Sequence, residues 1–512
     1  MSRLIRGLFA RIVAGLITAS LIAATALVAI AAPASALPPS QTVLYVVPNN
    51  LAVAYGGAAP AAYPLTYYSD SAPTTEVVSP NITGTAPACT STYVAMAQVA
   101  SPVQITCSGG SDAAYLFDTT ATAALTIGGA RVAAGLYHSC AVLATGAAQC
   151  WGYNGSGQLG DGTTSNSNLP VTVSTITTAV SVTAGYQHSC AVLSSGKVWC
   201  WGWNGDGQGQ LGNNSTANAS APVQVTGLPA TDPALSVVAG YAHTCALLAS
   251  GLVYCWGGNW LGQLGNGGWD QSTTAVQVSG ITDAVSISAG DSHSCAVLAS
   301  GQIKCWGYNG FGQLGDGTTG TSNVAVLVVG LSGAAVGVAT GADFSCAALA
   351  TGAVQCWGAN SYGQLGDGTT SESHVPVTVL ASAVVPLTGV ASLSAGGRYA
   401  CAVLSSGGVD CWGHNPNGEL GDGTTTDSSS PATVSLPAGV TAASVSAGGY
   451  HACAALTSGA VLCWGDNAYG GLGDGTTTQS LSPVLVLPGV ETLSATLYVV
   501  PDAQSVTYGD AA

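Results

Sequence analysis

The sequence predicts an all-β chain, in which a seven-bladed β-propeller follows a small β-rich, sandwich-like domain. A pattern of about 50 residues recurs seven times in tandem, and each copy holds a Cys-x9-Cys pair around a glycine turn. Glycine, Ser, Thr and Val prevail over helix formers, with 70 glycines and 2 methionines among 512 residues. Tandem repeats of this length, made of short strands, are typical of propeller blades.

The repeat opens with a segment such as Ala134-Gly-Leu-Tyr-His-Ser-Cys140, and each first cysteine is followed ten positions later by Cys-Trp-Gly. The cysteine pairs are Cys140 and Cys150, Cys190 and Cys200, Cys245 and Cys255, Cys295 and Cys305, Cys346 and Cys356, Cys401 and Cys411, and Cys453 and Cys463. The seven repeats cover about 128–177, 178–232, 233–282, 283–333, 334–388, 389–441 and 442–490.

The spacing of each cysteine pair predicts a disulfide across a β-hairpin. If Cys140 faces Cys150, then Leu143 faces Ala147 and a three-residue loop remains, which suits a glycine such as Gly146 at its last position. Directly opposed strand residues have Cα separations within disulfide range. The alternative, free buried thiols, would not need a partner at the same offset seven times.

Two further strands complete the predicted blade. Residues 179–183 precede one hairpin and residues 170–174 follow the previous glycine-rich loop, and both alternate with the period of a strand. Four strands per repeat, seven times, make a ring that closes on itself, so the last blade must meet the first.

The repeat Gly-x-x-His-Ser-Cys-Ala-Val-Leu…Cys-Trp-Gly-x-Asn-x-x-Gly-Gln-Leu-Gly resembles the repeat of the regulator of chromosome condensation, over roughly 128–490. The resemblance implies a seven-bladed propeller and binding of protein partners. The cysteines at two strand positions depart from the family pattern in the manner of its exported bacterial members.

The segments that flank the propeller resemble each other. Leu44-Tyr-Val-Val-Pro-Asn-Asn returns after the propeller as Leu497-Tyr-Val-Val-Pro-Asp-Ala. Both are similar to the start of the small MBG-type domains of bacterial surface proteins, which predicts one such β domain over 41–127 and the truncated start of a second over 496–512. Cys89 and Cys107 are expected to pair within the first copy. The short second copy suggests a fragment of a longer protein or a truncated gene.

The first 36 residues read as a secretory signal peptide. Three arginines precede an apolar stretch over 12–32, and Ala34-Ser-Ala36 supplies a cleavage site. The alternative is an uncleaved anchor. After cleavage no membrane span is expected, and sixteen cysteines in an exported chain favour disulfides and a secreted or cell-surface location.

Charge excludes one class of partner. Seven Lys and Arg stand against 23 Asp and Glu, and cleavage of the signal would leave four cations. Such a surface repels phosphate backbones, so no nucleic acid is expected as a partner.

Two sets of repeated polar residues raise the possibility of metal binding. His138, His188, His243, His293 and His451 share one repeat position, but Phe344 and Tyr399 replace them in two blades, which favours a hydrogen bond that fixes the turn before the hairpin strand over a metal site. Asp161 and its equivalents fit an Asp-Gly turn better than calcium. No metal site and no cofactor are therefore expected.

No catalytic set emerges either. The segment Gly155-Ser-Gly-Gln-Leu-Gly160 matches a dinucleotide fingerprint without a following helix, and Ser194-Ser-Gly-Lys197 lies on a predicted hairpin tip. The tryptophans after the second cysteines, such as Trp151, and the leucines of Gln-Leu-Gly are expected to pack between blades. Asn154 and its equivalents are expected to cap the loop through side-chain to backbone hydrogen bonds.

Binding should use residues that vary between blades. The loops after Cys-Trp-Gly carry large aromatic residues, which predict an aromatic rim for a protein or glycan partner; the alternative is that they pack between neighbouring loops. The second repeat also has a two-residue insertion, assigned to Gly209-Gln210. The aromatic residues are Tyr153, Trp203, Trp260, Tyr308, Phe311, Tyr362 and Tyr469.

The sequence therefore predicts a non-enzymatic protein- or glycan-binding module of a secreted or cell-surface bacterial protein. One alternative is a secreted inhibitor of an extracellular enzyme, as other secreted propellers of this fold are, although the flanking domains argue against a free-standing inhibitor. Guanine-nucleotide exchange, the activity of the family's eukaryotic namesake, is a third alternative, but none of that family's catalytic residues can be placed on this chain.

Overall fold

The computed structural model describes residues 132–205 and 207–487, and the backbone of eight short strands on either side of them. The chain forms two units: one comprises Met1–Ala95, Ala100–Ile127 and Thr496–Ala512, the other Met96–Val99 and Gly128–Ala495. The expected signal segment, 1–36, lies outside the described residues. No helix occurs in the described part of the chain, so none there is long and apolar enough to cross a membrane.

The described strands of the first unit form three small antiparallel sheets. One pairs β1 with β2, one pairs β5 with β6, and the third has the order β3-β4-β7-β38. Cys89 lies directly opposite Cys107 in the register of β3 and β4, and β38 joins the sheet from the segment after the propeller. The strands are β1 Tyr45–Pro48, β2 Leu65–Tyr68, β3 Ala88–Ser91, β4 Val103–Ser108, β5 Ser111–Asp112, β6 Tyr115–Leu116, β7 Thr122–Leu125 and β38 Val499–Pro501.

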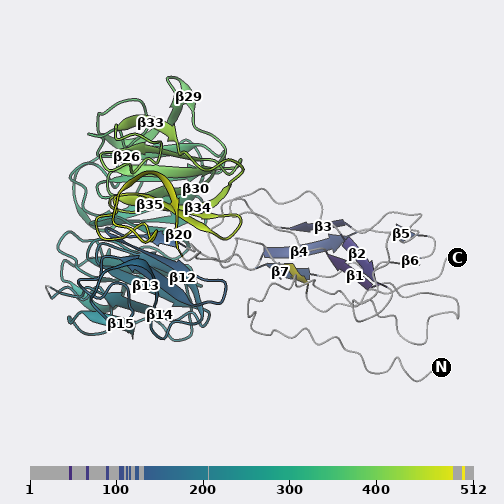
Figure 1. Ribbon diagram of the computed structural model, residues 1–512, viewed down its shortest axis with the longest axis horizontal. Coiled ribbons are helices and arrows are strands. Elements are labelled where there is room, and N and C mark those ends of the chain that lie inside the picture. The colour runs from purple at the N-terminus through teal and green to yellow at the C-terminus, as the bar shows by residue number, and fades with distance from the viewer. Residues whose placement is uncertain are drawn as a thin grey trace. The chain divides into compact units, whose positions relative to one another are not determined.

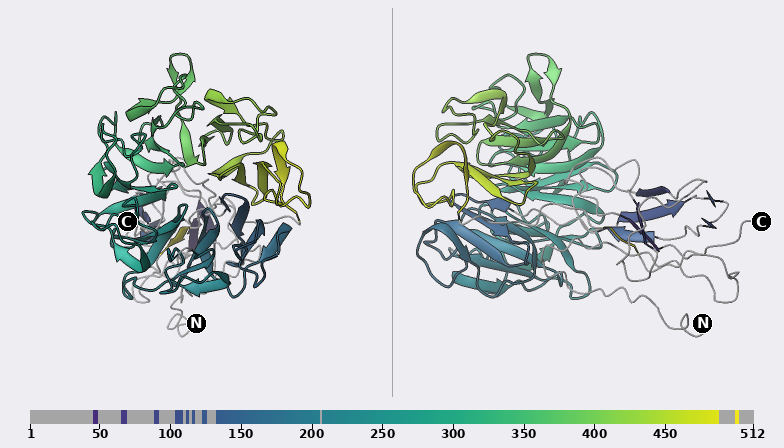
Figure 2. Two further views of the ribbon diagram at one scale, coloured as in Figure 1. Left: turned by 90° about the vertical axis from the view of Figure 1, so that its left-hand side faces the viewer. Right: turned by 45° about the vertical axis from the view of Figure 1, so that its right-hand side comes forward.

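The second unit is a seven-bladed β-propeller, as the repeats predict (Figure 1; Figure 2, left). Each blade is an antiparallel sheet of four strands that follow one another in the chain. The first strands of neighbouring blades contact each other all the way around the ring, which places them innermost.

The strand bounds repeat closely from blade to blade. Blade 1 has β8 Val132–Ala134, β9 His138–Val142, β10 Ala148–Gly152 and β11 Ser167–Thr172; blade 2 has β12 Ala179–Ala184, β13 His188–Leu193, β14 Val198–Gly202 and β15 Ala219–Gln224; blade 3 has β16 Ala234–Ala239, β17 His243–Leu248, β18 Val253–Gly257 and β19 Ser272–Gln277; blade 4 has β20 Ala284–Ala289, β21 His293–Leu298, β22 Ile303–Gly307 and β23 Ser322–Leu327. Blade 5 has β24 Ala335–Thr340, β25 Phe344–Leu349, β26 Val354–Gly358 and β27 Ser373–Thr378; blade 6 has β30 Val390–Ala395, β31 Tyr399–Leu404, β32 Val409–Gly413 and β33 Ser428–Thr433; blade 7 has β34 Ala442–Ala447, β35 His451–Leu456, β36 Val461–Gly465 and β37 Ser480–Leu485.

The hairpin of each blade has the expected register. Cys140 lies opposite Cys150, the Leu143 amide donates to the Ala147 carbonyl at 2.8 Å, and Gly146 has a φ of 82°. The cysteines therefore occupy a non-hydrogen-bonded pair, the closer of the two kinds of strand pair, and their Cα atoms are 4.0 Å apart. All seven pairs of the propeller form disulfides, which excludes the free-thiol alternative for these fourteen residues.

The hydrophobic core lies between blades rather than within them. Each of seven buried clusters joins the disulfide of one blade to the tryptophan of the next, as Cys140 and Cys150 join Trp201. The Trp201 indole N–H also donates to the Gln158 carbonyl at 2.9 Å, and every other blade repeats this bond. The predicted packing role of these tryptophans is confirmed.

The ring closes without a shared strand. Blades 7 and 1 meet through the tryptophan bond that every junction has and the histidine bond that most have: Trp151 donates to the Gly471 carbonyl at 2.9 Å, and Ser139 bonds His451 at 2.7 Å. A short hairpin, β28 Leu380–Ser382 and β29 Val385–Pro386, follows β27 and stands out from the ring (Figure 1).

Candidate functional site

One face of the propeller gathers the residues that differ between blades, and we call it the loop face. It consists of the inner turns, between the first and second strands of each blade, and the outer loops, between the third and fourth. Backbone hydrogen bonds join the two in every blade; the Tyr153 amide, for example, donates to the Tyr137 carbonyl at 2.9 Å. Seven inner turns and seven outer loops therefore form one continuous surface.

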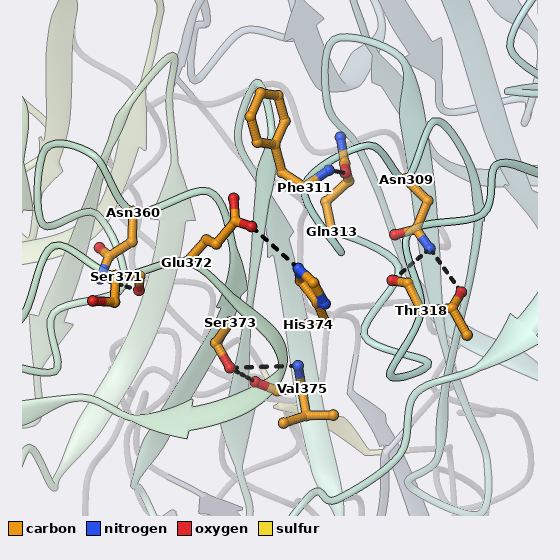
Figure 3. A network of polar contacts seen from close by, with 10 residues as sticks. All are labelled: Asn309, Phe311, Gln313, Thr318, Asn360, Ser371, Glu372, Ser373, His374 and Val375. Carbon is orange, nitrogen blue, oxygen red and sulfur yellow. Dashed lines mark hydrogen bonds and ion pairs between the residues drawn. The ribbon is translucent and has the colours of Figure 1, made fainter.

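A buried asparagine shapes each outer loop, as predicted. Asn309 Nδ2 donates to the Thr318 carbonyl at 3.1 Å (Figure 3). Asn309 Oδ1 accepts from the Leu314 amide at 2.9 Å. The Phe311 amide donates to Gln313 Oε1 at 3.0 Å, which orients the residue that carries the aromatic ring. A fixed backbone thus presents variable side chains.

The aspartates of these loops cap turns. Asp316 Oδ1 accepts from the Thr318 amide at 3.0 Å, and Asp161 accepts from Thr163 in the same way at 2.9 Å. The described residues contain no group of three or more His, Cys, Asp and Glu side chains that could hold a metal ion.

The seven aromatic residues predicted for the rim all lie on the loop face, in two states of exposure. Trp260, Phe311 and Tyr469 expose 44%, 38% and 40% of their surface. The other four, Tyr153, Trp203, Tyr308 and Tyr362, are half-buried. Exposure and packing occur together in this set, because the exposed Tyr469 also contacts Tyr153 and the exposed Phe311 also contacts Tyr308.

Two of the outer-loop aromatics, Trp203 and Tyr469, contact tyrosines of the inner turns. Around blades 7 and 1, Tyr137 contacts both Tyr450 and Tyr469, with ring centroids 5.3 and 5.1 Å apart, and Tyr153 contacts Tyr469 at 5.0 Å. In blades 2 and 3, Tyr186 and Tyr241 lie 4.2 Å apart and Trp203 meets Tyr241 at 6.2 Å. Stacked, tilted and edge contacts of this kind hold the aromatic side chains in place.

The inner turns surround a cavity of about 270 Å³ at the mouth of the central channel. Tyrosines border it on blades 2, 3 and 7, through Tyr186, Tyr241 and Tyr450, whereas blades 4 to 6 contribute charged side chains. The mouth is therefore polarised, with an aromatic sector facing a charged sector. The charged residues are Asp291, Asp343 and Arg398.

The charged sector is incompletely paired. Arg398 donates to the Tyr362 hydroxyl at 3.0 Å, and its guanidinium lies over the Tyr362 ring, 5.2 Å from the centroid. In the described part of the chain the Asp343 carboxylate accepts one hydrogen bond, a long one of 3.3 Å from Gln313 Nε2. Among the described residues the ion-pair distance is met only by Glu372, which precedes β27, and His374 on β27 (Figure 3).

The surroundings raise the pKa of both carboxyls. Asp291 is accessible in the channel mouth but enclosed by protein; this desolvation, with the nearby Asp343 charge, raises the pKa of Asp291 to about 6, against the lowering effect of Arg398. Desolvation also raises the pKa of Asp343. Burial, followed by its neighbour Tyr450, raises the pKa of Tyr137 to about 12, so that hydroxyl is neutral.

The repeated histidines lie beneath this face and link the blades. His138 Nε2 is 2.8 Å from the Ser189 hydroxyl of the next blade, and that hydroxyl donates to the Gln158 carbonyl at 3.0 Å. Since the hydroxyl proton goes to the carbonyl, the histidine must donate from Nε2. We expected a hydrogen bond that fixes the turn before the hairpin strand, and the side-chain bond that the structure shows joins two neighbouring blades. The equivalent contacts are His188 to Thr244, His243 to Ser294, His293 to Ser345 and His451 to Ser139.

The insertion in blade 2 lies elsewhere than expected. The Trp256 indole donates to the Gln210 carbonyl at 2.9 Å, the bond that Trp201 makes to Gln158, so Gln210 is the regular loop glutamine. The two extra residues therefore lie between Asn204 and Gly209, and the assignment to Gly209-Gln210 is wrong. The segment Gly207-Gln-Gly-Gln210 contains two equivalent dipeptides, and only the contact with the next blade distinguishes them.

The residues of the channel mouth were not identified as candidate site residues from the sequence. The two positions before each repeated histidine differ in every blade: Leu-Tyr, Tyr-Gln, Tyr-Ala, Asp-Ser, Ala-Asp, Gly-Arg and Gly-Tyr. Variation between blades was the signal used for the outer loops, and it would have identified these positions as well.

Fold and face together define a propeller whose blades are each closed by a disulfide and whose loop face surrounds a polarised channel mouth. A family model for the regulator of chromosome condensation (RCC1) repeat matches seven times, at residues 146–192, 195–247, 250–297, 300–348, 351–403, 406–455 and 458–510. A second model of the same repeat matches 130–158, 179–208, 235–263, 284–313, 335–364, 390–419 and 442–470. The chain belongs to the family of RCC1-repeat proteins.

Curated relatives are similar over part of their length. The human E3 ubiquitin-protein ligase HERC2 is 31% identical over 157 residues, which is 31% of this chain and 3% of the ligase. The ultraviolet-B receptor UVR8 of Arabidopsis thaliana is 35% identical over 146 residues, 28% of this chain and 32% of the receptor. The matches thus span a third or less of each relative.

Solved structures share the fold. Human WBSCR16 superposes with a TM-score of 0.60 at 24% identity, covering 66% of this chain and 94% of that one. Prp20p of Saccharomyces cerevisiae gives a TM-score of 0.58 at 20% identity, covering 69% and 86%. At these identities the likeness concerns the propeller itself.

Proposed function

We propose that the propeller is a non-catalytic interaction module of a secreted or cell-surface protein and that it binds a protein or glycan partner through the loop face. The observation that carries the proposal is the exposure of Trp260, Phe311 and Tyr469 on the face where the blades differ. Aromatic residues dominate the binding energy of interfaces because each buries a large apolar area with few rotatable bonds.

The architecture supports a binding role. Residues common to all blades, such as Trp201, Asn309 and the cystines, are buried and serve packing. The same backbone can therefore carry different side chains at each outer loop, as in other scaffolds that place binding residues on loops.

The disulfides support an oxidising compartment. Seven buried cystines in one domain are consistent with export, since cytosolic thiols are kept reduced. Inhibition of an extracellular enzyme would be one form of the same interaction. The variants described in the next paragraph would test it as well.

The test compares wild type with the variant Trp260→Ala/Phe311→Ala/Tyr469→Ala on a glycan array and against extracellular proteins, using biolayer interferometry on each binder found. We expect the triple variant to lose at least a hundredfold in affinity while its melting temperature stays within a few degrees. A matched control, Val384→Ala/Val385→Ala, removes exposed apolar side chains from the β28–β29 hairpin and should bind like wild type. Equal affinity of the triple variant and wild type would refute the proposal.

A further inference from the structure

The channel mouth has two acceptors without a cation. Asp291 and Asp343 come from neighbouring blades and border the same cavity. Asp343 makes one long hydrogen bond, to Gln313, and no bond or ion pair of the Asp291 carboxylate is found in the described part of the chain. Desolvation raises the pKa of both carboxyls, and the attraction of Arg398 offsets only part of this rise.

Arg398 does not complete the pairing. Among the described residues, Arg398 is the cation of the loop face. Lys197 lies on a hairpin tip at the opposite end of blade 2, and Lys304 donates to the Gly280 carbonyl at 3.0 Å. The Tyr362 hydroxyl and ring hold Arg398 at the outer side of the mouth. Its attraction lowers the pKa of both carboxyls without cancelling their shift.

An aromatic wall stands beside the carboxylates. The Tyr241 amide approaches the Asp291 carbonyl at 3.3 Å, which puts the Tyr186–Tyr241 pair next to Asp291. A tyrosine face attracts a cation, and its apolar surface accommodates the methylene stem of a long basic side chain. Carboxylates on one side and tyrosines on the other therefore suit a group with an apolar stem and a positive tip.

The cavity is small. Its volume of about 270 Å³ is below the usual range for sites of drug-sized molecules, which begins near 300 Å³. A single protruding side chain fits this size better than a chain of sugars does. The acidic composition of the protein, 23 acids against seven cations, attracts the same kind of partner at longer range.

We propose that the channel mouth is a socket for one lysine or arginine side chain that projects from a protein partner bound to the loop face. The proposal rests on the proposed function and names the class of partner, a protein with a basic anchor residue. Asp291 and Asp343 would pair the charge, and Tyr186 and Tyr241 would contact the stem.

The probe is Nα-acetyl-lysine amide, titrated into the full chain and followed by NMR or calorimetry, with N-acetylglucosamine and glucose as glycan probes. We expect millimolar lysine binding that weakens as salt is added and is lost at least tenfold in Asp291→Asn/Asp343→Asn. That variant should fold at least as stably, because it removes two like, desolvated charges. Arg398→Ala should bind lysine severalfold more tightly, since a repelling charge has gone.

Asp283→Asn is the control, because Asp283 is exposed at the opposite end of β20 from Asp291 and should leave lysine binding unchanged. Equal lysine affinity in wild type and Asp291→Asn/Asp343→Asn, or preferential binding of the sugars at the mouth, would overturn the socket. If the aromatic triple variant loses its partner while Asp291→Asn/Asp343→Asn keeps full affinity, the loop-face function stands and the socket fails. Loss of partner in both variants, with lysine competing, supports both.

Discussion

Mild acid should destabilise the propeller steeply, because five fully buried histidines are held neutral between blades. Burial lowers the pKa of His138, His243 and His293 to about 3 and of His188 and His451 to about 4. In the unfolded chain each has a pKa near 6.5. A lowered folded pKa means that the unfolded state binds more protons, so this stability is fully present above pH 6.5 and is lost as pH falls.

The magnitude follows from the linkage. At pH 5 each histidine forfeits about 2 kcal/mol, so five together forfeit about 10 kcal/mol, comparable to the whole stability of a typical domain. Asp291 acts in the opposite direction, since its raised pKa favours the folded state as pH falls, but it is accessible to solvent and offsets only part of the loss.

The decisive variant is His188→Phe, which copies blade 5, where Phe344 fills the same position. At pH 7.5 the variant should lose about 1 kcal/mol for the missing bond to Thr244. At pH 5 it should be more stable than wild type, because it is spared the histidine protonation that costs about 2 kcal/mol. Guanidinium unfolding, followed by tryptophan fluorescence at both pH values, measures the crossover.

His374→Gln, at the partly exposed His374, is the control and should follow the wild-type pH dependence. Parallel stability curves for His188→Phe and wild type, with no crossover, would refute the assignment of neutral buried histidines. A stability that stays flat from pH 7.5 to 5 would do the same.

Three further predictions concern the scaffold. Replacing Cys140 and Cys150 with alanine should lower the free energy of unfolding by about 2–3 kcal/mol, measured by denaturant titration. Alkylation of the unreduced, unfolded wild type should label none of the fourteen propeller cysteines. Widespread labelling would contradict the assignment of seven disulfides. Gly160→Ala should lower the stability by about 2–4 kcal/mol, because φ is +70° and a Cβ atom would lie 2.7 Å from Trp201 Cδ1. Gly162→Ala, with φ +91° and nothing within 4 Å of the added atom, should lower it by about 1 kcal/mol. Equal melting temperatures of the two variants would exclude the contact with Trp201. Asn309→Ala should cost about 2–3 kcal/mol, because it strands the Leu314 amide and the Thr318 carbonyl, and a loss below about 0.5 kcal/mol in calorimetry would show that water replaces the cap.

Features within one repeat could be predicted from the sequence, whereas bonds between repeats could not. The Cys-x9-Cys spacing was enough for the register of Cys140 and Cys150 and for the turn at Gly146. The partner of His138, by contrast, is the Ser189 hydroxyl one repeat further along the chain, and the repeat pattern alone does not show that these two side chains face each other. The same limit explains the misplaced insertion, since only Trp256 distinguishes Gln210 from Gln208.

For a similar reason, the outer-loop aromatics of the candidate site could be predicted from the sequence and the charges of the channel mouth could not. The outer-loop aromatics stand out as large residues in a glycine-rich setting. The charges of the mouth, such as Asp291 and Arg398, are single residues more than a hundred positions apart. They become one constellation only after the ring has brought blades 4 to 6 around a common axis.

The closure of the ring without a shared strand has a mechanical consequence. Tension applied between Val132 and Leu487 acts on the innermost strand of blade 1 and the region beyond the outermost strand of blade 7, so the load falls on the junction that Trp151 and Ser139 make with blade 7. Hydrogen bonds and side-chain packing, with no covalent bond, carry that load. We therefore expect the ring to open at this junction first under force. Each blade that then unfolds should extend by less than its full contour length, because its cystine keeps one loop closed.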